Sequence, residues 1–230
     1  MLPFFSQVIC DHLAVVLLIL LVASSPGEAA CPASDSGSLL NAMRESYAQV
    51  ENYRTTVEVE ESRKGHLYET KRFLYTFKKP DHIRIELMSP HKGTVLIYPD
   101  EHREVLVSMP GLLGFLKFHL SPDNSLLKVS AGQRIDQTDM GVLIRNISHT
   151  FTDQLKGEEQ ITEENDYILL SAVAENHFIK GMITRYRFFI DKSMFLPVRI
   201  EESTPNGTPE RTIIFHHLTV NTNVRGAFMQ

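Results

Sequence analysis

The stretch from Arg54 to Met109 contains the pattern that most restricts how this chain can fold. Within residues 81–88, Ile83, Ile85 and Leu87 alternate strictly with polar side chains. Successive side chains of a β-strand point to opposite faces, so this alternation predicts a strand with one buried face and excludes an amphipathic helix. A sheet of such strands must wrap its apolar face around either a packed core or a ligand.

Five strands are expected to follow one another between residues 54 and 109. The turns at 62–65 and 100–102 are short and polar, so strands adjacent in sequence should pair side by side in an antiparallel sheet. The first strand places Thr55, Val57 and Val59 on one face. From the second and third strands, the side chains that we expect to line the enclosed space are Phe73, Tyr75, Phe77, Ile83, Ile85 and Leu87.

The last third of the chain returns to strands. We expect them at 167–174, 182–190, 196–202 and 211–220, with a hairpin turn at Pro205-Asn206-Gly207, because Asn-Gly tolerates the positive φ that tight turns require. Nine strands are too many for one open two-layer sheet around a single helix. The expected fold is therefore mainly β within the α+β class: a strongly curved antiparallel sheet, or unclosed β-barrel, with helices plugging its concave side.

Two segments carry apolar residues at three- and four-residue steps, which is typical of a helix with one buried face. The first spans residues 38–53, and Ser36 or Ser38 can cap its start. The second spans residues 139–155, with Asp139 as its cap and Gly157 after its end. Between 158 and 166 the sequence is charged, and we expect a solvated loop there.

The N-terminus reads as a targeting segment. Residues 13–23 form an uncharged apolar run of signal-peptide length, too short for a comfortable membrane span of about 20 residues. No Lys or Arg precedes the run, so either the true start lies further on or the signal is atypical. An uncleaved anchor is the alternative to a signal peptide. We expect a signal peptide at 1–30, a polar linker at 31–37 and one ligand-binding domain at 38–230.

Cys31 follows two alanines, as a lipidated cysteine does in bacterial lipoproteins. Glu28 stands where such a signal has an aliphatic residue, so a soluble exported protein is favoured over one anchored through Cys31. Because Cys10 belongs to the signal segment, one cysteine remains and no disulfide is expected. The fold must then rest on packing.

No catalytic or metal-binding motif occurs in the sequence. The sequence contains no Gly-x-Ser-x-Gly elbow, no phosphate-cradling glycine loop and no Cys-x-x-Cys. His216 and His217 are adjacent on an expected strand and so should point apart, as should Glu201 and Glu202. The formal net charge of −5, without a basic stripe, disfavours nucleic acid as a partner. We expect neither an enzyme nor a cofactor nor a metal site.

Residues 111–120 interrupt the strands with an apolar run that does not alternate. One interpretation is ordinary core; another is a lid over a cavity, or an exposed tip that touches lipid. Gly111 and Gly114 would give a lid its backbone freedom. The residues that we expect at the cavity mouth, in contact with lipid, are Leu112, Leu113, Phe115, Leu116 and Phe118.

A set of local sequence matches accompanies this order of elements. They are Lys78-Lys79-Pro80, Ile83-Arg84-Ile85-Glu86, Ser89-Pro90, Val95-Leu96-Ile97-Tyr98-Pro99, Phe188-Phe189-Ile190-Asp191, Leu196-Pro197-Val198, Gly207 and Thr212-Ile213-Ile214-Phe215. Through them the chain resembles the LolA/LolB-like superfamily of periplasmic lipoprotein carriers and outer-membrane lipoprotein-sorting proteins. The resemblance spans most of residues 38–220 and points to an uncharacterised branch of that superfamily.

The resemblance implies an unclosed antiparallel barrel whose apolar cavity takes acyl chains of lipids or lipoproteins, with the membrane sorting machinery as a further partner. In the carriers, an arginine before the proline that ends the second long strand ties down the lid. Lys79 occupies that position here, and its single ammonium group lacks the planar set of donors that an arginine guanidinium has. The implied location is a Gram-negative-type periplasm. The alternative function is an envelope-stress sensor domain that binds misassembled outer-membrane components.

Overall fold

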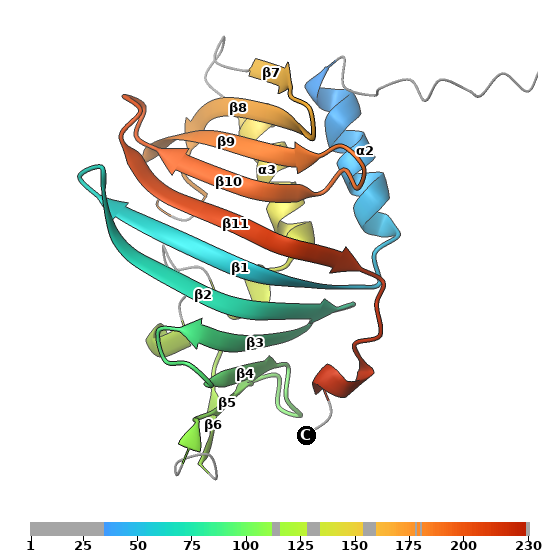
Figure 1. Ribbon diagram of the computed structural model, residues 1–230, viewed down its shortest axis with the longest axis vertical. Coiled ribbons are helices and arrows are strands. Elements are labelled where there is room, and N and C mark those ends of the chain that lie inside the picture. The colour runs from blue at the N-terminus through green and yellow to red at the C-terminus, as the bar shows by residue number, and fades with distance from the viewer. Residues whose placement is uncertain are drawn as a thin grey trace, which may run out of the picture. The chain divides into compact units, whose positions relative to one another are not determined.

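The computed structural model describes residues 35–111, 116–127, 134–153, 160–177, 179 and 181–228, and Figure 1 shows the arrangement of their elements. These residues form one sheet of eleven strands in the order β6-β5-β4-β3-β2-β1-β11-β10-β9-β8-β7. Every pairing between neighbours is antiparallel. β6 and β7 stand at opposite ends of the strand order, so the sheet is not closed into a barrel. The expected fold class is confirmed.

The strands differ widely in length. They are β1 (Asn52–Arg63), β2 (His66–Lys78), β3 (His82–Ser89), β4 (Val95–Tyr98), β5 (Val105–Ser108), β6 (Lys117–Leu120), β7 (Gln160–Glu163), β8 (Tyr167–Glu175), β9 (Ile183–Asp191), β10 (Pro197–Ser203) and β11 (Pro209–Val220). The longest, β1, β2 and β11, are neighbours at the centre of the strand order.

Alternation along the strands produces one apolar face. Phe77 pairs with Ile83 and Tyr75 pairs with Ile85 across β2 and β3. Each of these four side chains is 4% exposed or less. Residues opposite one another in an antiparallel pair share a face, and the four residues pack in one cluster with both helices. The period-two pattern therefore predicted the buried face correctly.

Two short edge strands were not expected. β6 lies in the apolar run after residue 111, and β7 lies in the charged stretch that we predicted to be a loop. The prediction of a loop at 158–166 was wrong for residues 160–163, whereas the role expected for residues 111–120 stays a prediction. Each strand is four residues long; β6 pairs with β5 and β7 pairs with β8, at the two edges of the sheet. Their pairing depends on the neighbouring backbone, which side-chain patterns do not encode.

The helix α2 (Ser36–Ala48) buries Leu39, Leu40 and Met43. Asp35 caps it: its carboxylate accepts from the backbone N–H of Ser38 at 2.8 Å and from the Ser38 hydroxyl at 2.9 Å. These hydrogen bonds lower the pKa of Asp35. The predicted helix ran to residue 53, which was too far, because Tyr53 is an inward-facing residue of β1 that happens to continue the helical spacing.

The helix α3 (Met140–Asp153) begins where the sequence placed it. The carboxylate of Asp139 accepts from the backbone N–H of Gly141 at 2.7 Å and of Val142 at 3.2 Å. Figure 1 shows α2 and α3 behind the sheet, on the same side of it. None of the described helices is long and apolar enough to cross a membrane.

Candidate ligand cavity

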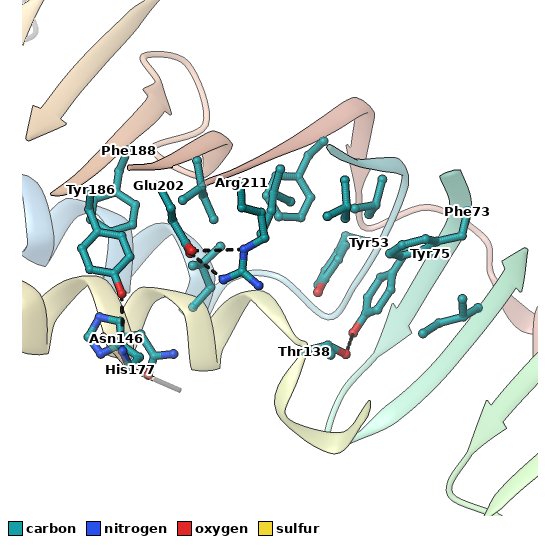
Figure 2. A pocket seen from close by; sticks show the side chains of 17 residues that line it. Tyr53, Phe73, Tyr75, Thr138, Asn146, His177, Tyr186, Phe188, Glu202 and Arg211 are labelled. Atoms are coloured by element: carbon teal, nitrogen blue, oxygen red, sulfur yellow. Dashed lines mark hydrogen bonds and ion pairs between the residues drawn. The ribbon is translucent and has the colours of Figure 1, made fainter. Parts of the chain in front are cut away.

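A cavity of about 90 Å³ lies between the apolar face of the sheet and α3. Figure 2 shows its walls from close by. Its apolar lining comes from β1, β2, β3, β9, β10, β11 and α3, and consists of Val57, Val59, Phe73, Ile85, Leu143, Phe188, Ile200, Ile213 and Phe215. Polar side chains gather at two places on this otherwise apolar wall.

Three of the six residues expected to line the enclosed space, Phe73, Tyr75 and Ile85, line this cavity. Phe77 and Ile83 are buried in the core cluster beside it, each 1% exposed. Leu87 packs against that cluster and is only partly buried. The inward face of the sheet is therefore divided between protein core and cavity wall, and its alternation does not distinguish the two.

Two tyrosines tie the start of α3 to the sheet. The Tyr53 hydroxyl accepts from the backbone N–H of Met140 at 2.9 Å, and the hydroxyls of Tyr75 and Thr138 lie 3.0 Å apart. The Tyr53 and Tyr75 rings stack with their centroids 5.7 Å apart. Burial raises the pKa of both phenols above the ordinary value. These hydroxyls stay neutral and position the helix.

A buried ion pair forms the second polar place. The Arg211 guanidinium donates twice to the Glu202 carboxylate, through Nε at 3.1 Å and Nη2 at 2.6 Å. Their side chains are 6% and 10% exposed. The two residues stand opposite each other across β11 and β10, and both reach into the cavity wall (Figure 2).

Sequence reasoning missed this pair. The sequence predicted that Glu201 and Glu202 point apart but assigned neither of them to the interior, and Glu201 does lie on the outer face, where it pairs with Arg187 at 2.7 Å. Glu202 is buried. Alternation of inward and outward positions along β10 could have placed Glu202 inside, and a buried carboxylate requires a cation such as Arg211.

Further polar residues complete this part of the cavity wall. The backbone N–H of His177 donates to the Tyr186 hydroxyl at 3.3 Å, and His177 Nε2 lies 2.6 Å from the hydroxyl of Thr150 on α3. Asn146, also on α3, completes this part of the wall. Burial raises the pKa of the Tyr186 phenol, and the charge of Glu202 adds to the effect. These residues and the ion pair thus make up the second of the two polar places on the cavity wall.

Lys79 contacts the end of α2. Its ammonium donates to the backbone carbonyls of Tyr47 at 3.1 Å and of Ala48 at 3.0 Å, and lies 5.0 Å from the centre of the Tyr47 ring. A cation is favourable at a helix C-terminus, where carbonyl groups lack partners. The Tyr47 hydroxyl in turn donates to Asp139 at 3.1 Å, which caps α3. Lys79 thereby connects the sheet with both helices.

Two of the five residues expected at the cavity mouth, Leu116 and Phe118, are among the described residues. Leu112, Leu113 and Phe115 lie outside the described residues, as does Cys31. Leu116 is 37% exposed and Phe118, on β6, is 45% exposed. Neither lines the cavity.

Phe118 nevertheless lies on the inward face of the sheet. It pairs with Val107, which pairs with Leu96, which pairs with Ile85 of the cavity wall. Phe118 therefore ends a row of inward-facing side chains at the sheet edge.

Among the described residues, one group could offer three ligands to a metal ion: Asp100, Glu104 and His119. His119 Nδ1 lies 2.6 Å from Asp100 Oδ2, and Asp100 Oδ1 accepts from the backbone N–H of Glu104 at 2.7 Å. These hydrogen bonds account for the closeness of the three residues, and we assign no metal site to them.

No protein-family model matches this sequence, and no curated protein matches it. Its fold, in contrast, has known counterparts. A crystal structure of MucB superposes with a TM-score of 0.52 at 12% sequence identity, covering 85% of this chain and 62% of that chain. The chain thus spans about three-fifths of the MucB chain, and the likeness is one of fold.

Two further structures are similar over most of both chains. An uncharacterized conserved protein from Thermus thermophilus has a TM-score of 0.48 and 11% identity, covering 84% of this chain and 93% of that chain. A LolA superfamily protein from Nitrosomonas europaea has a TM-score of 0.39 and 12% identity, covering 84% and 97%. The predicted architecture, an open antiparallel sheet with helices on one face, is confirmed by the strand order and the position of the helices.

Proposed function

We propose that this protein is a non-enzymatic, exported envelope protein that binds acyl chains of lipids or lipoproteins and carries or receives them. The observation that supports this most directly is the cavity between the sheet and α3, whose wall is mostly aliphatic and aromatic. An apolar cavity with a few convergent polar groups is the usual form of a small-molecule site.

The volume of the cavity bears on how a chain would enter. At about 90 Å³ it is smaller than the roughly 300–1,000 Å³ of typical ligand sites. An acyl chain can enter only if α3 moves away from the sheet. The polar place formed by Arg211 and Glu202 then suits the head of an amphiphile, and the apolar part of the wall suits its chain.

Binding is tested with a fluorescent fatty-acid probe and with mass spectrometry of lipid that co-purifies with the protein. We expect saturable binding of the probe and a co-purified lipid. Leu143→Trp adds a larger side chain to the cavity wall and should weaken probe binding about tenfold or more while the sheet stays folded. A protein that purifies without lipid and ignores the probe would contradict the proposal.

Leu126→Trp is the matched control. It makes the same chemical change at a side chain that is 82% exposed and outside the cavity wall. Probe binding equal to that of the unaltered protein is expected, with the circular dichroism of both variants checking the fold. Equal weakening by the two substitutions would mean that the probe binds the surface.

The lid and the anchor belong to the same proposal. Leu113→Glu combined with Phe115→Glu should abolish lipid binding and leave the sheet folded, whereas global unfolding would identify the segment as core. We propose a soluble protein of the periplasm with Cys31 unmodified. Palmitate labelling that reaches the unaltered protein and spares Cys31→Ser would instead demonstrate a lipid anchor.

The second candidate function is an envelope-stress sensor domain. One observation favours it: MucB has a similar fold, and MucB has been crystallised in complex with MucA(peri). A sensor would bind a protein segment and would not hand lipid from donor to acceptor vesicles. Transfer of a labelled lipid between vesicles by this protein would favour the carrier.

A further inference from the structure

A second pocket lies on the face of the sheet opposite the cavity. Its volume is about 340 Å³, within the range of roughly 300–1,000 Å³ that is typical of small-molecule sites. Its floor is formed by β1, β2 and β3, and its roof by the segment that follows β11, with Asn223, Val224, Gly226 and Ala227. Unlike the cavity, this pocket has a floor of polar side chains.

The roof is held in place at its start. Asn221 accepts from the backbone N–H of Glu51 at 2.7 Å and donates through Nδ2 to the Gln49 carbonyl at 3.0 Å. The backbone N–H of Thr222 donates to the Asn52 side chain at 3.0 Å. Val224 is 8% exposed. The segment is thus a built part of the fold that covers the outer face of the sheet.

The floor is a single row across three strands. Arg54 on β1 pairs with Thr76 on β2, and Thr76 pairs with Arg84 on β3. Adjacent strands lie about 4.8 Å apart, so the backbones of the two arginines are roughly 10 Å from each other, with the threonine between them. Two guanidinium groups and one hydroxyl therefore line the same pocket.

The donors of this row are largely unused. Within the described part of the chain, the Arg54 guanidinium makes no hydrogen bond or ion pair, and neither does the Thr76 hydroxyl. Thr76 is only 2% exposed. Arg84 donates through Nε to Glu86 at 2.9 Å, which leaves its two terminal amino groups without a partner among those residues. Of the three residues only Thr76 is buried, whereas Arg54 is exposed and Arg84 is partly exposed, so the unused guanidinium donors are open to a ligand.

We propose that this outer pocket binds a phosphate group. Guanidinium groups are planar donors that match phosphate oxygens in pairs, and they bind them more strongly than neutral donors do. Two arginines against the single carboxylate of Glu86 give the pocket a net positive charge. Two guanidinium groups and a hydroxyl offer more donors than the two oxygens of a carboxylate can accept. A phosphate group presents three oxygens and up to two negative charges.

The phosphate can come from a soluble phosphate ester or from a phospholipid headgroup. The proposal does not rest on acyl-chain binding, because the pocket and the cavity lie on opposite faces of the sheet. The two sources are distinguished by separate arms of one experiment. The first arm titrates the full chain with inorganic phosphate and with glycerol 3-phosphate at constant ionic strength, by isothermal titration calorimetry. The second measures sedimentation with vesicles of phosphatidylglycerol in phosphatidylcholine.

We expect saturable binding in at least one arm and roughly tenfold or greater weakening by Arg54→Gln and by Arg84→Gln. Thr76→Val keeps the buried volume and removes only the hydroxyl, so it should weaken binding with little change in melting temperature. Binding to vesicles that glycerol 3-phosphate displaces would identify the headgroup as the source. Binding confined to the first arm would identify a soluble phosphate ester.

Arg72→Gln is the matched control. Arg72 lies on β2 with its side chain half-exposed, pairs with Glu58 at 3.1 Å and is outside the pocket. Its substitution removes the same charge and should leave binding unchanged. Equal weakening by Arg72→Gln and Arg54→Gln would show a nonspecific effect of net charge and overturn the proposal, as would the absence of binding in both arms.

Discussion

Arg211 and Glu202 make the most demanding contact in the molecule at the scale of single residues. Two charges removed from water are costly unless they pair closely, and here the pairing is bidentate with both side chains nearly covered. The pair also sits in the wall of an otherwise apolar cavity. Its contribution to stability is therefore best measured by breaking it from one side and then from both.

Arg211→Met should lower the free energy of unfolding by about 3–5 kcal/mol, because it leaves the Glu202 carboxylate buried without a cation. Combining it with Glu202→Leu should recover most of that loss, since a pair of apolar side chains needs no partner. Urea denaturation of the two variants and the unaltered protein measures the difference. A double variant as unstable as the single one would mean that the pair stabilises the fold through more than mutual neutralisation.

Lys79 offers a second test at this scale. Lys79→Met removes two charge-assisted hydrogen bonds to the last turn of α2 and should destabilise the protein by about 1 kcal/mol, with the loss concentrated in that helix. Hydrogen exchange of the α2 amides should therefore accelerate more than that of the amides in the central strands. Lys78→Met is the control, because Lys78 is exposed and precedes it directly. Unchanged hydrogen exchange in α2 would contradict the expected role of Lys79 in holding this helix against the sheet.

At the scale of elements, the sequence predicted the long strands and both helices because each of them has one face covered by protein. β2 and β3 alternate, and α3 carries an apolar stripe with a capping aspartate before it. The four-residue strands β6 and β7 were not predicted, because their side chains are mostly exposed and the strands form by pairing with the edge of a neighbouring strand. The sequence likewise predicted an apolar inner face but could not divide it into core and cavity.

Phe118 on β6 tests whether that edge strand takes part in ligand binding. Phe118→Glu should weaken binding of the fatty-acid probe several-fold with little loss of stability, since the side chain is 45% exposed and ends an inward-facing row. Leu67→Glu, at a side chain 62% exposed near the β1–β2 turn, is the control and should bind the probe normally. Probe affinity unaffected by either change would restrict the mouth of the cavity to other residues.

At the scale of the whole molecule, the buried tyrosines predict how the fold responds to alkali. Burial raises the pKa of Tyr53, Tyr75 and Tyr186 above the ordinary value of about 10. The stability gained by keeping these phenols neutral is full below pH about 10 and is lost as the pH rises toward their folded-state values. We expect alkaline unfolding in which their tyrosinate absorbance appears together with the loss of circular dichroism.

Tyr75→Phe should reduce the alkaline absorbance change that accompanies unfolding, and the variant should lose stability less steeply above pH about 10. Its hydroxyl also lies 3.0 Å from that of Thr138, so a modest loss of stability at neutral pH is expected as well. Complete tyrosinate absorbance while the circular dichroism is still native would contradict the burial of these phenols.

The strand order has a consequence for how the chain reaches this fold. Each strand pairs with its neighbour in sequence except at the centre, where β1 meets β11 across more than 140 residues of intervening chain. The strands from β1 to β6 and those from β7 to β11 can each assemble from local hairpins, but their union requires closure of a very long loop and is expected to be late and slow. Until residues 209–220 join it, β1 exposes a twelve-residue unpaired edge, which is the kind of edge that associates with other chains. Of the strands of this sheet, β11 is synthesised last, and it is the strand that protects the middle of the sheet from aggregation.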